Sequence, residues 1–153
     1  MAKITDSIKN FFENQNFVII STIDKNGTLH NSCKGIIEIR EHSKVYLLDL
    51  YKARTMVNLK NNPNIAITAV DEHKFKGYSI KGQARIINMQ DCQPHVVKAW
   101  EAKLASRISQ RVIKNMLSKK EHPLHPEALL PKPEYVIEVV IHDVIDLTPH
   151  NLK

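Results

Sequence analysis

The chain has 153 residues, of which 42% are hydrophobic, so its size and composition are those of one folded domain, which we expect to span residues 1–153. Its formal net charge of +6 indicates an anionic partner, but only 6% of its residues are aromatic, which argues against a base-stacking nucleic-acid surface. No apolar run approaches the roughly 20 residues of a membrane span, and no secretory signal pattern is present. We therefore expect a cytoplasmic protein that binds neither membranes nor nucleic acids.

The N-terminal part of the chain predicts a helix followed by a β-hairpin. Apolar residues at helical spacing predict an amphipathic helix over Lys3–Asn14. A β-branched run predicts a strand over Phe17–Ile23, and the following Asp24–Gly27 ends in Asn-Gly, the dipeptide of tight hairpins. The second strand is expected over Thr28–Arg40, because its second half alternates apolar and charged residues.

The middle of the chain predicts three more strands and one short helix. The strands are expected over Val45–Leu50, Ile65–Val70 and Tyr78–Met89. Between the first two of these, Lys52–Asn61 has helical spacing and ends before a proline. The helix thus connects two strands.

Two glycines in this region indicate places where the backbone departs from a regular strand. Lys76-Gly77 is expected to loosen the connection between the fourth and fifth strands. Gly82 falls inside the fifth strand, where a glycine marks a bend or a close approach of another backbone.

The remainder of the chain predicts helix, loop and a last strand. Apolar residues near helical period predict one or two helices over Asp91–Lys119, and four prolines make the following stretch to Pro133 an irregular loop. Tyr135–Leu147 is β-branched and predicts a sixth strand, with a bulge or kink at His142-Asp143. Six strands of this kind close most economically as an antiparallel barrel, with residues 91–133 as a helical insertion.

The cysteines and the histidine-rich loop do not predict a disulfide, a metal site or a catalytic nucleophile. Cys33 and Cys92 have no metal-type spacing and are expected to be free thiols. His122, His125 and Glu127 crowd the proline-rich loop, but their spacing fits no ligand pair, so no metal site is predicted.

Three segments, in this order along the chain, resemble the flavin-binding split barrels related to pyridoxamine-phosphate oxidase. They are Ser21–His30 with its Asn-Gly hairpin, Arg54–Pro63 with the short helix, and Ile80–Ala84 with its internal glycine. The resemblance spans Phe11 to Met89. It implies a mainly β fold: a six-stranded antiparallel split β-barrel of Greek-key order, with an N-terminal helix, a short inter-strand helix and a helical insertion before the last strand.

The start of the short helix is the candidate phosphate site. Arg54 and Thr55 open that helix, where unpaired backbone N–H groups and the positive end of the dipole favour an anion. Arg54 offers charge-assisted hydrogen bonds to phosphate oxygens, and Thr55 offers a hydroxyl. The alternative is an ordinary first helical turn with a solvated arginine.

The resemblance implies two further contact regions for FMN. The first is a polar part of the second strand that would contact the ribityl chain, the phosphate and the ring edge: Asn31, Ser32, Cys33 and Lys34. The second follows the third strand and would present backbone groups to the pyrimidine side of the ring: Asp49, Leu50 and Tyr51. Without the resemblance, the first region also reads as an edge strand and Asp49 as an ordinary strand-end carboxylate. Trp100 could cover a flavin, although an aromatic residue on an apolar stripe is more often part of a core.

The resemblance implies an FMN-dependent oxidoreductase without a catalytic side chain, using NAD(P)H or a redox protein, and a homodimer with flavin at the interface. The alternatives are a non-catalytic FMN carrier or sensor, a relative that uses deazaflavin or haem, and a basic nucleic-acid-binding barrel. A pyridoxamine-phosphate oxidase proper is not expected. Gly77 stands where those enzymes have a glutamine, and their C-terminal Trp and Arg pattern is missing after Tyr135.

Overall fold

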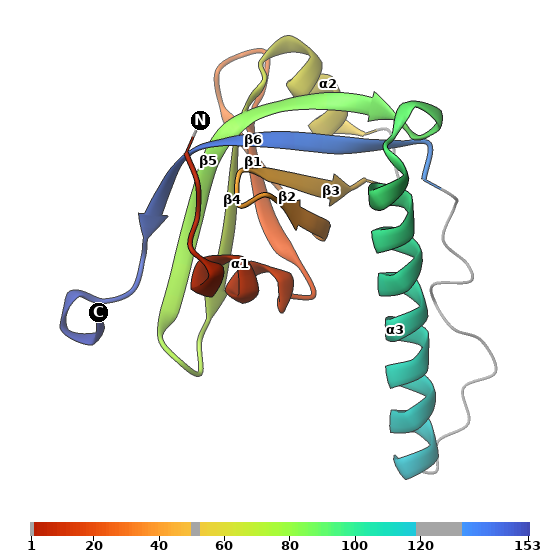
Figure 1. Cartoon of the computed structure of the whole chain (residues 1–153). Coiled ribbons are helices and arrows are strands. Elements are labelled where there is room, and N and C mark those ends of the chain that lie inside the picture. The colour runs from red at the N-terminus through yellow and green to blue at the C-terminus, as the bar shows by residue number, and fades with distance from the viewer. Residues whose placement is uncertain (1, 50–52, 119–132) are drawn as a thin grey trace.

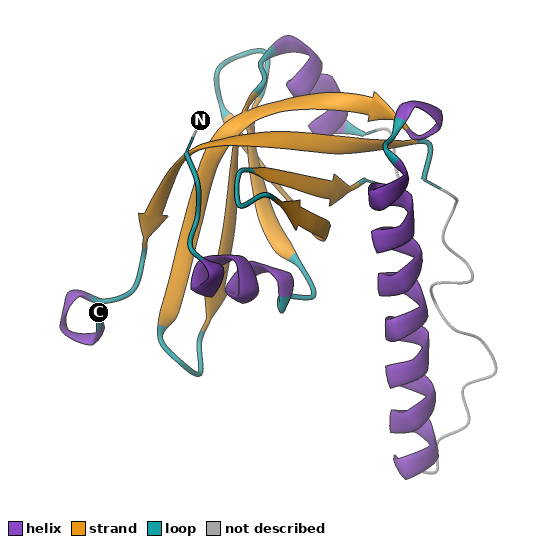
Figure 2. Ribbon diagram, in the orientation of Figure 1, coloured by secondary structure: helices purple, strands orange, loops and turns teal. Residues whose placement is uncertain are grey.

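The computed structural model of the chain describes residues 2–49, 53–118 and 133–153, apart from the side chains of residue 108 and residues 110–118. Within these ranges the fold is mainly β, with helices on its outside (Figure 2). The elements in chain order are α1 Asp6–Glu13, β1 Val18–Ile23, β2 Leu29–Arg40, β3 Lys44–Leu48, α2 Arg54–Asn61, β4 Asn64–Asp71, β5 Lys76–Asn88, the 3-10 helix η1 Met89–Asp91, α3 Pro94–Ser118, β6 Tyr135–Asp146 and the 3-10 helix η3 His150–Leu152.

The six strands form a closed antiparallel barrel in the order β1-β2-β3-β6-β5-β4, and β4 pairs with β1 to complete the ring. The last strand, β6, lies between β3 and β5 and pairs with both of them (Figure 1). Because every strand of the barrel has two neighbours, no strand is left as a sheet edge. The six-stranded antiparallel split barrel expected from the sequence is therefore confirmed, together with its helices.

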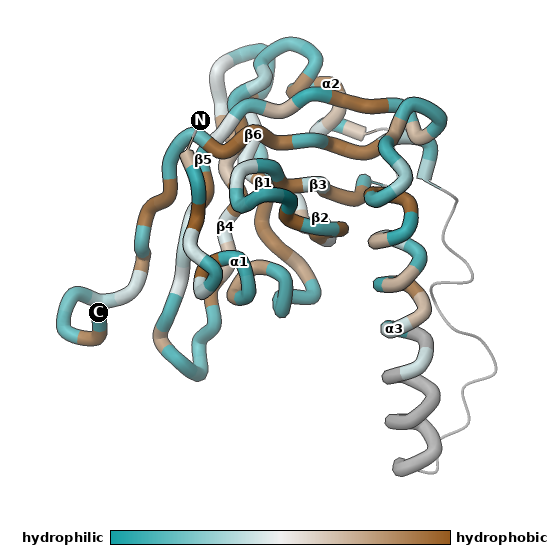
Figure 3. The backbone as a smooth tube through the Cα atoms, in the orientation of Figure 1, coloured by the Kyte–Doolittle hydropathy of each residue, from teal (hydrophilic) through white to brown (hydrophobic). Residues whose placement is uncertain are grey.

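Aliphatic side chains fill the barrel and make its main core. In Figure 3 the hydrophobic stretches follow the strands, whereas the turns between them are hydrophilic. The fully buried members of this core at 0% exposure are Phe12, Ile20, Val45, Leu47, Ile67, Ile80, Ile137, Val139 and Ile141. Burying each of these side chains contributes about 1.5–3 kcal/mol to the free energy of unfolding.

A second, smaller core lies outside the barrel, under the first turns of α3. It consists of Ile37, Tyr46, Val96 and Val136, and Trp100 is partly buried against it. Trp100 is thus a packing residue of the apolar stripe. The helix is one continuous element, and Figure 1 shows its C-terminal half extending past the barrel.

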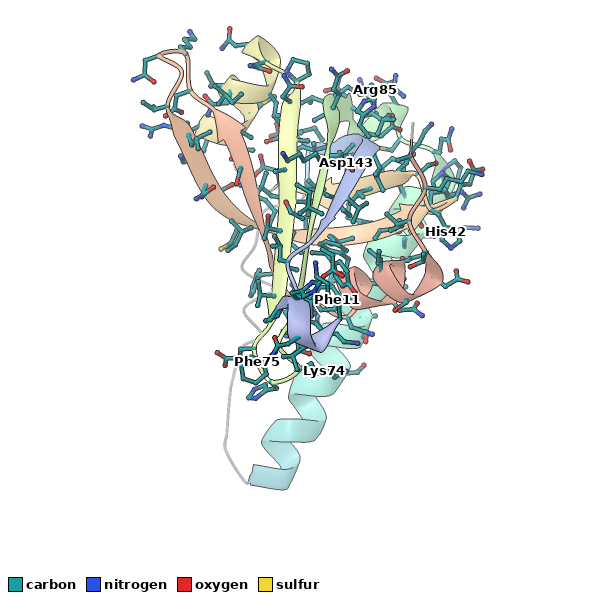
Figure 4. All side chains as sticks on the ribbon, turned by 90° about the vertical axis from the view of Figure 1, so that its left-hand side faces the viewer. Phe11, His42, Lys74, Phe75, Arg85 and Asp143 are labelled. Atoms are coloured by element: carbon teal, nitrogen blue, oxygen red, sulfur yellow. The ribbon has the colours of Figure 1, made fainter. Side chains whose placement is uncertain are left out.

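The N-terminal helix starts three residues later than its apolar pattern predicts. Thr5 is the N-cap, and its side-chain oxygen accepts a hydrogen bond from the Ile8 N–H. The residues before it run alongside the barrel, where the Ala2 N–H donates to the Ile141 carbonyl at 2.8 Å. Phe11, labelled in Figure 4, packs edge-on against Tyr78 of β5 with ring centroids 5.0 Å apart. The helix is therefore fixed across one end of the barrel.

Two β-bulges shift the pairing register, one on β6 and one on β2. On β6, Lys81 pairs with Asp143 and Gly82 pairs with Ile141, so His142 is left out of the ladder, which confirms the bulge expected there. On β2, Ile36 pairs with Leu47 and the next pair starts at Glu38, so Ile37 is left out. Ile36 packs inside the barrel and Ile37 in the second core under α3, as alternation along a strand requires. The bulge places the next residue, Glu38, opposite Tyr46 of that second core, so Ile37 and Glu38 both lie on the outer side.

The hairpin turn between β1 and β2 forms where the sequence predicts it, whereas the turn between β4 and β5 does not. Gly27 has a φ of +85°, as expected for the Asn-Gly hairpin. The expectation that Lys76-Gly77 loosens the connection was wrong, because both residues pair in β5 with β4. The hairpin turn is formed instead before them, and Phe75 there has a positive φ of 53°. Figure 4 shows Phe75 at this hairpin tip and Arg85 towards the opposite end of the molecule.

Gly82 is required because the backbone of β6 passes directly over it. A Cβ added there would lie 2.2 Å from the Val140 carbonyl oxygen. We expect Gly82→Ala to lower the free energy of unfolding by about 1–3 kcal/mol, measured by urea denaturation, because the strand must shift to avoid the clash.

Gly35→Ala on β2 is the matched control, because a Cβ at Gly35 meets nothing within 4 Å. Equal stabilities for the two variants would contradict this account of the Gly82 position.

Candidate flavin site at the start of α2

The first turn of α2 has no side-chain cap. Ala53 is its N-cap residue and makes no side-chain hydrogen bond to the helix. The backbone N–H groups of this turn are therefore left to solvent or to a ligand. Arg54 is exposed and, within the described residues, has no hydrogen bond or ion pair. This end of α2 thus combines unpaired donors with an unpaired positive charge.

The second predicted phosphate residue, Thr55, lies against the second strand. Its side chain is buried, with 2% exposure, and its Oγ1 is 2.9 Å from the Oγ of Ser32 on β2. These two hydroxyls come from positions 23 residues apart in the chain. The structure therefore brings together Ser32, Thr55 and the start of α2, which were predicted separately.

The polar stretch of β2 divides between the two faces of the strand. Ser32 and Lys34 pair opposite Ile20 and Val18, whose side chains fill the barrel, so they share its inner face. Asn31 and Cys33 point to the outer face and are both exposed. Asn31 there accepts a hydrogen bond from the Ser21 hydroxyl at 2.6 Å, and Cys33 pairs opposite Ile19.

Lys34 of β2 and Asp49, which follows β3, form a buried ion pair at one end of the barrel. The Lys34 Nζ lies 2.7 Å from the Asp49 Oδ1, and the two side chains are 14% and 0% exposed. The Tyr135 hydroxyl donates to the other carboxylate oxygen of Asp49. Burial, together with this hydrogen bond and the negative charge of Asp49, raises the pKa of Tyr135, so it stays a donor. Leu50 and Tyr51, predicted next to Asp49, lie outside the described residues.

Asn58 is a further polar residue that the sequence reasoning left without a role. It is 2% exposed, and its Nδ2 donates to the Thr22 hydroxyl at 3.0 Å and to the Asp24 carboxylate at 2.8 Å. The hydrogen bond from Asn58, with smaller contributions from Thr28 and Arg54, lowers the pKa of Asp24. Asn58 thereby fixes α2 to β1 and to its hairpin. A buried asparagine in a helix could be noticed in a sequence, but its partners could not.

A separate polar cavity of about 210 Å³ lies on the outer wall of the barrel beside the start of α3. Glu138 is one of its lining residues; it is 5% exposed and accepts hydrogen bonds from the Tyr46 hydroxyl and the Arg85 Nε, both at 2.9 Å. Burial favours the neutral acid, but these hydrogen bonds and the positive charges of Arg85 and Lys44 together outweigh burial and lower the pKa of Glu138. Cys92 also lines this cavity, and burial raises the pKa of its thiol.

No group of metal-binding side chains occurs among the described residues. His122, His125 and Glu127 lie outside them. Both cysteines are free thiols. No helix in the described part of the chain has the length and apolar character needed to cross a membrane.

The family of the chain follows from a comparison with family models. The model described as pyridoxamine 5'-phosphate oxidase matches residues 4–138. The chain belongs to the pyridoxamine 5'-phosphate oxidase family. The resemblance seen in the sequence is therefore confirmed. No curated protein matches the chain.

Solved structures of similar fold cover nearly the whole chain. HupZ of Group A Streptococcus is 18% identical with a TM-score of 0.67, over 95% of this chain and 94% of that one. General Stress Protein 26 of Bacillus anthracis is 16% identical with a TM-score of 0.56, over 95% and 94%. A protein named F420 reductase is 13% identical with a TM-score of 0.56, over 93% and 98%. At these identities, the neighbours show that the oxidase-family fold is shared and nothing more.

The Lys34–Asp49 pair gives a test of how this end of the barrel is held together. We expect Asp49→Asn to lower the free energy of unfolding by about 3 kcal/mol, because it leaves the Lys34 charge buried without its counter-charge. Chemical denaturation at neutral pH measures the change.

The control is Lys9→Met, which removes the lysine of the partly exposed Lys9–Glu13 pair, 3.5 Å apart. It is expected to change stability by less than about 1 kcal/mol. If Asp49→Asn were no more destabilising than this control, the pair would not hold the site.

Proposed function

We propose that this chain is a flavoprotein that binds FMN with its phosphate at the start of α2. The observation that supports this proposal best is the uncapped first turn of α2 with the unpaired Arg54 beside it. Backbone N–H groups and a guanidinium are the donors that phosphate groups commonly meet in proteins. Membership in the pyridoxamine 5'-phosphate oxidase family makes a flavin the ligand to test first.

The side chains at this position fit a phosphate in chemistry as well as in charge. Arg54 would donate to two phosphate oxygens, and the hydroxyls of Ser32 and Thr55 would donate to the third or to the ribityl chain. The two hydroxyls already lie within hydrogen-bond distance of each other, so one approach to this corner reaches both. The anchor would thus be built from β2 and α2 together.

The charges around the anchor favour the same assignment. The positive charge of Lys34 is already compensated by Asp49 at 2.7 Å. Arg54 has no carboxylate within ion-pair distance among the described residues, and the more distant Asp24 acts on it only electrostatically, so it is the cation available to an anionic ligand. Lys34 would then contact the ligand as a hydrogen-bond donor while its charge remains balanced by Asp49.

The other predicted contacts complete the proposal. Backbone groups of Asp49, Leu50 and Tyr51 would meet the pyrimidine side of the ring. Asn31 and Cys33 lie on the outer face of β2, so they would contact a ring held between two copies of the chain. Exposed apolar side chains near this face, Phe17, Ile19 and Leu29, support a homodimer with a flavin at the interface. We place the protein in the cytoplasm, in keeping with its free thiols.

The bound flavin would supply hydride or electron transfer between NAD(P)H or a redox protein and an acceptor. The residues of the chain would anchor and orient it, and no side chain is assigned as an acid or a base. Pyridoxamine phosphate itself is not proposed as the substrate, because Gly77 occupies the position of the expected glutamine.

Arg54→Ala tests the anchor. We expect it to weaken FMN binding by about tenfold to a hundredfold, the loss of a hydrogen bond to a charged group, without unfolding the protein. Isothermal titration calorimetry with FMN measures the affinity, after the visible spectrum of the purified protein has been recorded.

Lys60→Ala is the matched control, because Lys60 is an exposed cation on the last turn of the same helix. Unchanged FMN affinity in Arg54→Ala would place the phosphate elsewhere. A colourless protein that does not bind added FMN would overturn the proposal as a whole.

A carrier or sensor is distinguished from a reductase by turnover. The reductase predicts that NAD(P)H, added without oxygen, bleaches the visible absorbance of the FMN-loaded protein, and that an acceptor restores it. Loaded protein that never bleaches with NAD(P)H or with a reduced protein donor would support the carrier.

Deazaflavin is the second cofactor candidate, because one structural neighbour is named F420 reductase. Haem remains a further alternative from the sequence. Mass spectrometry of the cofactor released from the purified protein distinguishes all three groups.

A further inference from the structure

A second cavity, of about 480 Å³, lies where α3 crosses the end of α1 and the middle of β2. Its walls include Glu13, Asn16, Ile37, Lys103, Ser106 and Arg107. None of the residues assigned to the flavin lines it. In Figure 1, α1 and α2 lie at different ends of the barrel.

Two cations on one face of α3 point into this region. Lys103 and Arg107 are four residues apart, so their side chains are neighbours on the helix surface. Lys103 donates through Nζ to the backbone carbonyl of Ile36, and Arg107 donates through Nη2 to the carbonyl of Asn16 at 2.9 Å. Each side chain is therefore held in place by a neutral acceptor.

Neither cation has a counter-charge of its own. Within the described part of the chain, no carboxylate lies within ion-pair distance of Lys103 or Arg107. The nearest acid on the wall, Glu13, is 3.5 Å from Lys9 and also accepts the Ile39 N–H at 3.2 Å. Lys9, Lys103 and Arg107 thus outnumber the single carboxylate at this place.

Burial and the charge of Arg107 both favour the neutral form of Lys103, and they lower its pKa although Glu13 acts in the opposite direction. An anion between the two cations would relieve their mutual repulsion and restore the charge on Lys103. Donors remain for such an anion, since among the described residues Lys103 uses one of its three N–H groups in a hydrogen bond and Arg107 uses one of its five.

The cavity also has room and apolar surface for more than a bare ion. Its volume far exceeds the roughly 30 Å³ that a water molecule takes in the liquid. Ile37 supplies an aliphatic wall, against which the apolar body of a ligand could rest. The Phe17 ring is not part of this wall, but its centroid lies 5.4 Å from the Arg107 guanidinium and helps to orient that cation.

We propose that the cavity between α1, β2 and α3 binds a small organic anion, whose phosphate or carboxylate group is held by Lys103 and Arg107. The Ser106 hydroxyl and the Asn16 side chain, both at the wall, supply further polar contacts. The site goes beyond the proposed flavin function and does not depend on it.

The test is titration calorimetry with two probes, phenyl phosphate and benzoate, which distinguish the two anionic groups. We expect saturable binding of at least one probe, weakened at least about tenfold in the Lys103→Met, Arg107→Met double variant. Lys98→Met, an exposed lysine on the same helix, is the matched control and should bind as the unchanged protein does. All of these proteins are prepared in the Arg54→Ala background, so that the phosphate site proposed at the start of α2 does not contribute to the titration.

A second measurement uses the unchanged protein, so it does not depend on the folding of the double variant. The NMR signals of the Lys103 ε-methylene group should titrate at higher pH when the bound probe is present. The proposal is overturned if neither probe binds, if the double variant binds as tightly as the Lys98 control, or if the Lys103 titration is unmoved by a bound probe.

Discussion

The pairing of β6 with both β3 and β5 is the constraint on which the rest of the structure depends. β3 and β5 are separated by α2 and β4 in the chain, and neither pairs with the other. Only β6, which follows the α3 segment, brings their free edges together and closes the ring. Closure therefore relies on contacts that are distant in the chain, which makes this step entropically expensive and slow to form.

The same closure organises the polar residues at the start of α2. Tyr135, at the first position of β6, reaches Asp49 just beyond the end of β3, and Asp49 in turn holds Lys34 of β2. Further along β2, Ser32 contacts Thr55 of α2. The proposed anchor for the flavin phosphate is thus attached to three strands of the barrel. A loop at that position would hold a ligand less precisely than these elements do.

Local patterns predicted the elements well, but not the contacts between distant ones. The Asn-Gly turn at Gly27 follows from backbone sterics, which act within a few residues. Gly82 signals a close approach in its strand, but the backbone that approaches it, at Val140 of β6, could not be identified from the sequence. The hydrogen bond between Tyr135 and Asp49 joins positions 86 residues apart, and no local pattern contains it. The division of β2 into two faces was predictable, because alternation alone places Asn31 and Cys33 opposite to Ser32 and Lys34. Gly77 was misjudged because a glycine pattern does not reveal whether a strand continues through it.

The bulge at Ile37 has a consequence for how the chain can evolve. Ile36 lies inside the barrel and Ile37 under α3, and one extra residue lets Ile39 return to the barrel core although Ile37 and Glu38 both lie outside it. Exchange of Ile36 or Ile37 for another aliphatic residue changes the packing only in the core to which that side chain belongs. Loss or gain of one residue in this stretch would instead reverse the faces of β2 on one side of it, because side chains alternate along a strand. Among homologues, the spacing from Lys34 to Arg40 should therefore be conserved in length more strictly than in residue type.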